Sequence, residues 1–281
     1  MNKEDLKYVC WNITTKCNKK CIYCFRELFE SDRTLEDNMK ILHKLHEAGV
    51  NRITFSGGEP LSYECIYDLA KEANRLGIET FIVTNGDYVN EHNIEEICDL
   101  FQRITFSCDS PSPWVNKESG RGEDNYEHIL YLCHLINQVR PGHIVQINSV
   151  VTRENYGEQE HMLTAMRDEL FMEGVERIKF FQFYPIRGYS KKRSSFLSIT
   201  KEQFDALRQK QEQRDELFDV TFKDIEFLNR DCVVSPKGAL KESENYQDRT
   251  LIDNILDVSS EELRSAIDTH YENKKVGGLH V

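Results

Sequence analysis

Alternating strand and helix patterns over the first two thirds of the chain constrain its fold most strongly. Runs of β-branched and apolar residues predict six strands, at residues 7–14, 52–56, 79–84, 103–108, 144–151 and 177–183. Helical periodicity fills the intervals, at residues 35–49, 63–77, 92–101, 124–139 and 158–171. Because strands that alternate with helices form parallel sheets, we expect an α/β fold. Six such units do not complete an eightfold barrel, so the pattern predicts a partial (βα)6 TIM-like barrel that is open along one side.

The strand–helix rhythm stops after Phe183. Residues 187–195 are basic and rich in serine, which favours a mobile loop. A polar helix at 200–214, a short apolar run at 232–235 and a helix at 259–271 follow. We therefore predict a partial-barrel domain at 1–186 and a C-terminal α/β extension at 187–281 that completes and caps the substrate site.

Charge and cysteine usage exclude several classes of protein. The 281 residues carry a formal charge of −12, whereas a nucleic-acid surface needs massed Lys and Arg. No segment has the apolar length of a membrane span, and the N-terminus has no apolar stretch typical of a secretion signal. Nine cysteines, an odd number, indicate reduced thiols rather than a disulfide framework. We expect a cytoplasmic protein that binds neither nucleic acid nor a membrane.

Three of the cysteines form a cluster directly after the first predicted strand. Cys17, Cys21 and Cys24 have the spacing C-x3-C-x2-C, on a loop at the carboxyl edge of the sheet, where α/β proteins gather their chemistry. Crowded thiolates select an iron–sulfur cluster or zinc. Zinc sites usually take two separated pairs of ligands, and the sequence has no second pair. Three thiolates fit a 4Fe–4S cubane in which one iron has no protein ligand. The alternative is that the three cysteines are buried and purely structural.

This motif resembles that of the radical S-adenosylmethionine superfamily. In that family the open iron binds the amino and carboxylate groups of the methionine moiety, and reductive cleavage of the sulfonium bond gives a 5′-deoxyadenosyl radical. The resemblance implies a 4Fe–4S cluster and S-adenosylmethionine as cofactors. It also implies a flavodoxin- or ferredoxin-type reductant as partner.

The resemblance extends to residues that contact the cofactor in the family. The segment Gly57-Gly58-Glu59-Pro60 is similar to the family's GGEP motif, which binds the methionine amine. Further cofactor-binding positions that the resemblance implies are Tyr23, Asn85, Ser107 and Arg121. For Arg121 the methionine carboxylate, a substrate phosphate and an ordinary surface turn remain open.

Longer segments resemble the viperin branch, which dehydrates nucleotides. They lie in order at 104–110, 120–122, 147–151, 177–182 and 255–258. The branch converts CTP, and in prokaryotic members also UTP or GTP, to the 3′-deoxy-3′,4′-didehydro nucleotide, an antiviral chain terminator. Past residue 133 only Cys232 remains, so we expect no auxiliary cluster.

Two cations on the sixth predicted strand fit a triphosphate. Arg177 and Lys179 are two residues apart and therefore point to the same face. If that face is the barrel interior, an anionic ligand has to offset their burial. The alternative is an outward face balanced by Glu173 and Glu176. Gln146 and Asn148 on the fifth strand are further candidates for contacts to the sugar or phosphate.

Two departures from the viperin pattern keep other substrates open. Gln146 replaces a lysine, and Cys232 stands where the branch has a tyrosine proposed to supply the last proton. The tail with Gly277 and Gly278 resembles a loop that closes over the triphosphate, or is simply a frayed terminus. The alternatives are a radical enzyme that acts on a peptide or another small molecule, and a non-catalytic Fe–S binding module.

Overall fold

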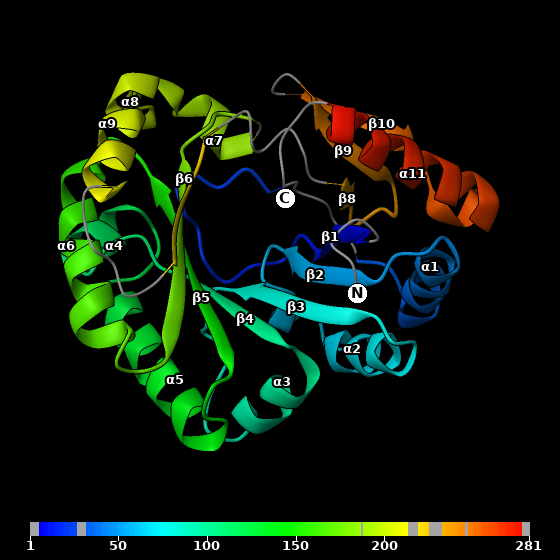
Figure 1. Ribbon diagram of the computed structural model, residues 1–281, viewed down its shortest axis with the longest axis horizontal. Helices are drawn as coiled ribbons and strands as arrows, with labels where there is room; N and C mark the ends of the chain where they lie inside the picture. The colour runs from blue at the N-terminus through cyan, green and yellow to red at the C-terminus, as the bar shows by residue number, and fades with distance from the viewer. Residues whose placement is uncertain are drawn as a thin grey trace. The chain divides into compact units, whose positions relative to one another are not determined.

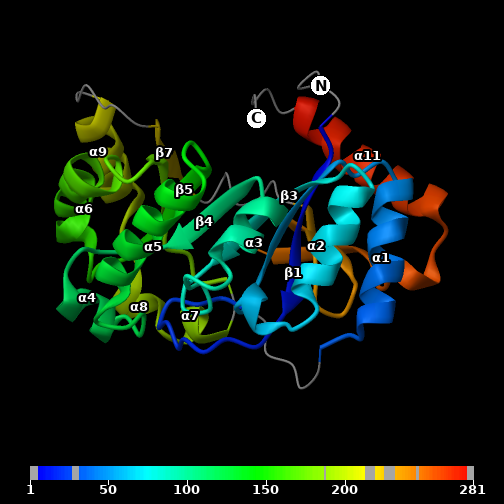
Figure 2. The same ribbon diagram turned by 90° about the horizontal axis from the view of Figure 1, so that it is seen from below.

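The computed structural model describes residues 6–26, 32–186, 188–212, 219–224, 232–244 and 247–276. The chain divides into two compact units (Figures 1 and 2). The first comprises Met1–Lys16, Leu28–Ile82 and Leu228–Val281, and the second comprises Cys17–Glu27 and Val83–Phe227. The chain therefore enters the second unit with the cysteine loop, returns to the first, and crosses again within its third strand.

The first unit is built on parallel strands with an antiparallel edge. Its strands are β1 (Tyr8–Thr14), β2 (Arg52–Gly57), β3 (Glu79–Thr84), β8 (Cys232–Val234), β9 (Leu240–Glu244) and β10 (Gln247–Ile252), in the order β10-β9-β8-β1-β2-β3. β1 pairs in parallel with β2 and β8, whereas β9 is antiparallel to both β8 and β10. The helices α1 (Leu35–Glu47), α2 (Ile66–Arg75) and α11 (Ser260–Val276) pack around it.

The second unit has four parallel strands with helices outside them. The strands are β4 (Arg103–Ser107), β5 (Ile144–Val151), β6 (Val175–Gln182) and β7 (Asp219–Lys223), paired in that order. The helices are α3 (Ile94–Leu100), α4 (Pro113–Glu118), α5 (Asn125–Val139), α6 (Gln159–Ala165), α7 (Gly188–Lys192), α8 (Ser194–Leu197) and α9 (Lys201–Glu212). Phe180 of β6 stacks on Phe222 of β7, and Phe204 of α9 meets Phe222 edge-on, so this face of the sheet packs against helices (Figure 1).

The six predicted strands and the helices between them are confirmed. The predicted helix at 158–171 is shorter than expected, because α6 ends at Ala165 and a π-helical turn follows at Met166–Leu170. The expected mobile loop at 187–195 is wrong: α7 and α8 form there, and Arg187 lies outside the described residues. Leu197, the last residue of α8, is buried in a hydrophobic cluster with Cys21, Tyr23 and Phe183. The domain boundary after residue 186 stays a prediction.

No helix in the described ranges is both long and apolar enough to span a bilayer.

The turn after β2 needs glycine because it approaches another segment of the first unit closely. The Gly58 amide donates to the Thr14 carbonyl at 2.8 Å, and the Glu59 amide donates to the Lys16 carbonyl at 2.7 Å. A Cβ on Gly58 would overlap the Lys16 carbonyl, and Gly57 has a φ of +137°. The GGEP turn is therefore fixed to the backbone that leads directly into Cys17.

We expect Gly58→Ala to lower the free energy of unfolding by about 1–3 kcal/mol, because the new methyl group meets backbone that cannot rotate away. Gly157→Ala is the matched control, since a Cβ at that position would have no neighbour within 4 Å and the φ of Gly157 is not in the left-handed region. Urea unfolding of both variants measures the effect. Equal stabilities of the two variants would contradict the close approach.

Candidate active site

The cysteine loop, residues 17–26, is supported by the turn that follows α4. The Ile22 amide donates to the Ser119 carbonyl at 2.9 Å. Gly120 has a φ of +74°, and a Cβ there would collide with the Lys20 carbonyl. The Cys21 thiol lies 3.7 Å from the Gly120 carbonyl oxygen. Backbone contact without intervening side chains thus holds the middle of the loop.

Residues that follow β3 hold the Cys17 end of the loop. The Asn85 amide nitrogen Nδ2 donates to Asn18 Oδ1 at 2.9 Å and lies 3.8 Å from Cys17 Sγ. The Asp87 carboxylate accepts from Asn18 Nδ2 at 2.5 Å and pairs with Lys19 Nζ at 2.8 Å. Asn85, which the sequence predicts as a cofactor contact, therefore positions a predicted cluster ligand in this structure.

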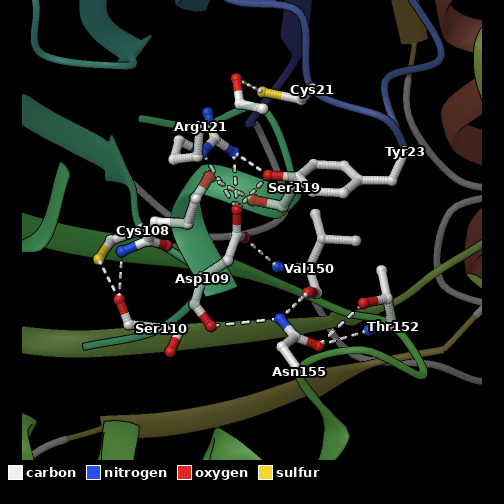
Figure 3. Close-up of polar contacts among 12 residues, drawn as sticks. Cys21, Tyr23, Cys108, Asp109, Ser110, Ser119, Arg121, Val150, Thr152 and Asn155 are labelled. Carbon is white, nitrogen blue, oxygen red and sulfur yellow. Dashed lines mark hydrogen bonds and ion pairs between the residues drawn. The ribbon is translucent and has the colours of Figure 1, made fainter. Parts of the chain in front are cut away.

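A buried group of three side chains anchors the other end of the loop (Figure 3). Tyr23, Asp109 and Arg121 are 6%, 1% and 7% exposed. The Tyr23 hydroxyl donates to Asp109 Oδ2, and Arg121 Nε donates to the same oxygen at 3.0 Å. Arg121 Nη2 also donates to the Tyr23 hydroxyl at 2.7 Å. We call these three residues the buried triad; it joins the cysteine loop, the segment after β4 and the turn after α4.

Asp109 also connects the triad to the sheet. Its second oxygen, Oδ1, accepts from the Val150 amide on β5 at 2.8 Å. Asn155 Nδ2 donates to the carbonyls of Asp109 at 3.2 Å and Val150 at 2.8 Å (Figure 3). Every oxygen of the Asp109 carboxylate therefore has a donor, as a buried charge requires.

Burial sets the protonation of the groups around the triad. Cys21, Tyr23, Phe183 and Leu197 form one hydrophobic cluster, with Cys24 and Val150 partly buried against it. Burial raises the pKa of the Cys21 thiol, and the Arg121 charge acts in the opposite direction. Burial likewise raises the pKa of Tyr23 well above its usual value, so its hydroxyl stays a proton donor to Asp109.

The donor set of the loop fits an iron–sulfur cluster. It offers three thiols from one loop, with Cys21 buried and Cys17 and Cys24 half-buried, and soft sulfur ligands are those that such clusters take. Within the residues that the structure describes, no group of three or more His, Cys, Asp or Glu side chains is arranged to hold a single metal ion.

Two rows of polar side chains cross one face of β4–β7. Residues paired in register across parallel strands point to the same side of the sheet. The first row is Thr105, Gln146, Arg177 and Asp219, and the second row is Ser107, Asn148, Lys179 and Thr221. We call them the polar rows.

The polar rows lie on the face that the cysteine loop covers. Gln146, Asn148 and Val150 alternate along β5 and share one side, and Val150 packs against the cluster of Cys21 and Tyr23. The opposite face carries Phe180, which packs toward α9. The rows therefore face the loop and not the helical layer.

Several buried polar atoms in the first row lack a hydrogen-bond partner. They are Thr105 Oγ1, Gln146 Oε1 and Arg177 Nε, and Thr105 and Gln146 are only 1% and 2% exposed. Arg177 Nε lies 3.8 Å from the Asp219 carboxylate, which is beyond hydrogen-bonding distance. Gln146 Nε2 donates to Asn148 Oδ1 at 2.7 Å. Unsatisfied polar groups at this depth are rare, so these atoms are open to hydrogen bonds from a ligand or from water.

Among the described residues, the two glutamates of the outward alternative lie in other surroundings. Glu173 pairs with His134 at 2.9 Å, and Glu176 alternates to the other face of β6. The carboxylate nearest Arg177 among the described residues is that of Asp219. Sequence patterns did not predict Asp219 as a site residue, because β7, the strand that carries it, is short and half-exposed.

The remaining predicted residues lie in separate places. Gly57, Gly58 and Glu59 form the turn described above, and Glu59 caps the short helix at Pro60–Ser62. Cys232 is fully buried in β8, opposite Glu242 of β9. Gly277 and Gly278 lie outside the described residues. The roles of all these positions stay predictions.

Sequence reasoning missed three residues that organise the site: Asp87, Asp109 and Asn155. A signal for Asp87 and Asp109 exists, since each carboxylate follows closely on a strand that ends at the cysteine-loop edge. Asn155 has no comparable signal.

Comparisons with known proteins agree with this geometry. A profile of the Radical SAM superfamily matches residues 11–165. A curated relative, the S-adenosylmethionine-dependent nucleotide dehydratase of Flammeovirga pacifica, is 29% identical over 249 residues, 84% of this chain and 83% of the relative. A protein of the same name from Thermoplasmatales archaeon (strain ISO4-H5) is 27% identical over 251 residues, 87% and 86% of the two chains.

Among solved structures, Streptococcus suis SuiB bound to S-adenosylmethionine is similar, with a TM-score of 0.67 and 17% identity. The match covers 95% of this chain and 65% of SuiB, so this chain spans about two thirds of that protein. At this identity the likeness concerns the fold.

The chain belongs to the radical SAM superfamily, because the profile match covers more than half of its length. It is thus an S-adenosylmethionine-dependent enzyme, and a 4Fe–4S cluster and S-adenosylmethionine are its cofactors. The predicted fold class, an α/β partial barrel, is confirmed.

We expect Cys17→Ala and Cys24→Ala each to abolish cluster binding, because a cubane in this family has three protein thiolates. Cys65→Ala is the control, since Cys65 is also half-buried but lies at the start of α2. Iron and sulfide analysis after anaerobic reconstitution should give about four irons per chain for the control only. Full iron content in either loop variant would refute the assignment.

The buried triad predicts strong thermodynamic coupling. Asp109→Ala should cost about 3–5 kcal/mol of unfolding free energy, because it leaves the Arg121 charge buried and unpaired. Adding Arg121→Met should restore part of that loss, whereas Tyr23→Phe should cost only about 1 kcal/mol. Denaturant unfolding in a double-mutant cycle measures the coupling. Additive effects of Asp109→Ala and Arg121→Met would contradict it.

Proposed function

We propose that the chain is a radical nucleotide dehydratase. It converts a nucleoside triphosphate, CTP as first choice and UTP or GTP as alternatives, to the 3′-deoxy-3′,4′-didehydro nucleotide with loss of water. The observation that carries the proposal is the pair of polar rows facing the cysteine loop, with three buried polar atoms unpartnered. Curated relatives named nucleotide dehydratases support the same substrate class.

The polar rows change from neutral side chains on β4 and β5 to cationic side chains on β6. On β4 and β5 the first row is buried and neutral, with oxygen acceptors at Thr105 and Gln146. On β6 Arg177 and Lys179 are half-buried cations. A sugar hydroxyl fits the neutral end, because it can donate to an acceptor, and phosphate oxygens fit the cationic end.

The residues of the second unit would orient the ligand and exclude water from it. When bound, the cluster and S-adenosylmethionine supply the radical that removes the ribose 4′-hydrogen. Asn148 accepts from Gln146 through Oδ1, which leaves its amide nitrogen as a donor, and it is paired in register with Lys179. Arg121 Nη1 makes no hydrogen bond within the described residues and is the donor we assign to the methionine carboxylate. The triad keeps that donor at the cysteine loop.

The neutral amide of Gln146 keeps the positive charge of the polar rows low, which bears on the class of substrate. The formal charge of the two rows is +1, from Arg177, Lys179 and Asp219. A triphosphate carries about four negative charges, so binding needs Mg²⁺ or further cations. A radical enzyme that acts on a less charged molecule or a peptide is the second candidate, and the low charge of these rows favours it.

Anaerobic assays with CTP, UTP, GTP and ATP distinguish these candidates. The proposal predicts that one nucleotide raises the yield of 5′-deoxyadenosine above the uncoupled background and itself loses 18 mass units, the mass of water. Arg177→Ala and Lys179→Ala should each raise the KM for that nucleotide roughly 10- to 100-fold, because each removes a charge-assisted contact.

Lys210→Ala is the matched control, because Lys210 is an exposed cation on α9 that pairs with Glu160. Its KM should equal that of the wild type. Cofactor cleavage that no nucleotide stimulates, or that both strand-six variants leave unchanged, would exclude the dehydratase and favour the second candidate.

A further inference from the structure

The segment that contains α7 and α8 carries an exposed run of cations. Lys191, Lys192 and Arg193 are consecutive and all exposed, and no acidic residue occurs between Gly188 and Lys201. Within the described part of the chain, none of these three side chains forms an ion pair or a hydrogen bond. Such unpaired, adjacent cations repel one another, so they are not a source of stability.

The region of the cysteine loop is also basic, and two of its lysines are paired, Lys16 with Asp32 and Lys19 with Asp87. From Thr15 to Arg26 the chain has four basic residues and no acidic one. Lys20 is exposed and unpaired in the described structure, and Arg26 uses its Nη1 to donate to the Lys19 carbonyl at 3.3 Å. In a chain with a formal charge of −12, both segments are exceptions.

The two cationic segments meet at the predicted cluster ligands. Leu197, the last residue of α8, belongs to the hydrophobic cluster of Cys21, and Cys24 packs against that cluster. Both views show α7 and α8 beside the blue cysteine loop (Figures 1 and 2). Lys191 is six residues before Leu197 in largely helical backbone, which puts its Cα roughly 10 Å away.

Exposed aromatic rings accompany the charges. Phe25, which follows Cys24, is 44% exposed, and Phe196, which precedes Leu197, is 71% exposed. Aromatic anchors within a rim of charge are typical of protein docking surfaces. We call Lys20, Arg26, Lys191, Lys192 and Arg193, with the two rings, the cationic collar.

We propose that the cationic collar is the docking surface for an acidic one-electron carrier protein, which reduces the cluster. This inference rests on the proposed radical function and names the face of the chain that its reductant uses. One electron leaves the carrier, which is oxidised, and enters the cluster, which is reduced; no atom is transferred.

Charge and position favour a protein carrier over a nucleotide as the occupant. Four collar cations are exposed, Lys20 on the cysteine loop and Lys191, Lys192 and Arg193 on the segment of α7 and α8, and Arg26 is half-buried. The ligand-sized set of buried unpartnered atoms lies instead on β4–β6. Electrostatic steering accelerates the encounter of oppositely charged proteins, and small interfaces suffice for transient redox complexes. An overall acidic chain that gathers cations at its cluster loop thereby selects both a partner and an orientation.

The test uses the reconstituted holoenzyme, an acidic flavodoxin as the probe, and Lys191→Glu combined with Lys192→Glu. The Kd for flavodoxin at low ionic strength should rise at least about 10-fold, and its salt dependence should weaken. Flavodoxin-driven cluster reduction should slow in parallel, whereas reduction by dithionite, a small reductant, should keep its wild-type rate. Lys191→Gln with Lys192→Gln should give a smaller effect of the same sign.

Lys40→Glu combined with Arg75→Glu is the control, because it changes the net charge equally on exposed helix faces of the first unit. The Kd of this variant for flavodoxin should stay within about twofold of the wild type, because its substitutions lie outside the collar. The variant should also stay folded, since exposed ion pairs contribute little to stability. An unchanged Kd in the collar variant, or equal effects in collar and control variants, overturns the proposal. So does an unchanged flavodoxin Kd with a raised nucleotide KM under dithionite, which would make the collar a surface through which nucleotides reach the site.

Binding and cluster reduction are both measured without nucleotide. Failure of every nucleotide to react would therefore refute the dehydratase and leave the docking result standing.

Discussion

The buried contact of Arg121 with Asp109 and the Tyr23 hydroxyl is the interaction on which the site depends. A buried ion pair adds little net stability by itself, because desolvation offsets the attraction. Its effect is on geometry, since each member comes from a different segment and the second carboxylate oxygen of Asp109 accepts from the Val150 amide on β5. Breaking one contact leaves a charge unpaired, so alternative positions of the cysteine loop are costly. The structure thus fixes a loop that holds three thiols without any regular secondary structure of its own.

The sheet beneath that loop shows how one fold combines a packed core with a reactive face. On β5 and β6, residues such as Ile178 and Phe180 are fully buried against helices, while the alternating positions carry the polar rows. The period of two along each strand therefore separates stability from function. The polar atoms without partners lie on the second of these faces, at a depth where water-free burial would otherwise be unfavourable. This is why we assign the ligand to this face, and the external electron to the exposed collar outside it.

Much of this organisation can be predicted from the sequence, and the exceptions have physical reasons. Strong apolar periodicity predicts β1–β6, and the C-x3-C-x2-C spacing with the GGEP segment predicts the cofactors. Local patterns do not predict β7, whose pairing with β6 is long-range, or α7 and α8, whose polar sequence is held by a single buried leucine. The triad escapes prediction for the same reason, because Tyr23 and Asp109 are 86 positions apart. To predict the face on which Arg177 and Lys179 lie, one also needs the register of three strands, β5, β6 and β7.

In our proposal, the radical formed at this loop attacks the ribose of a nucleotide bound on the polar rows. The most direct measurement is the mass of 5′-deoxyadenosine after turnover with the active nucleotide deuterated at C4′ of its ribose. We predict that one deuterium is transferred from the nucleotide to 5′-deoxyadenosine. Unlabelled 5′-deoxyadenosine, formed while all deuterium stays in the nucleotide, would contradict this claim.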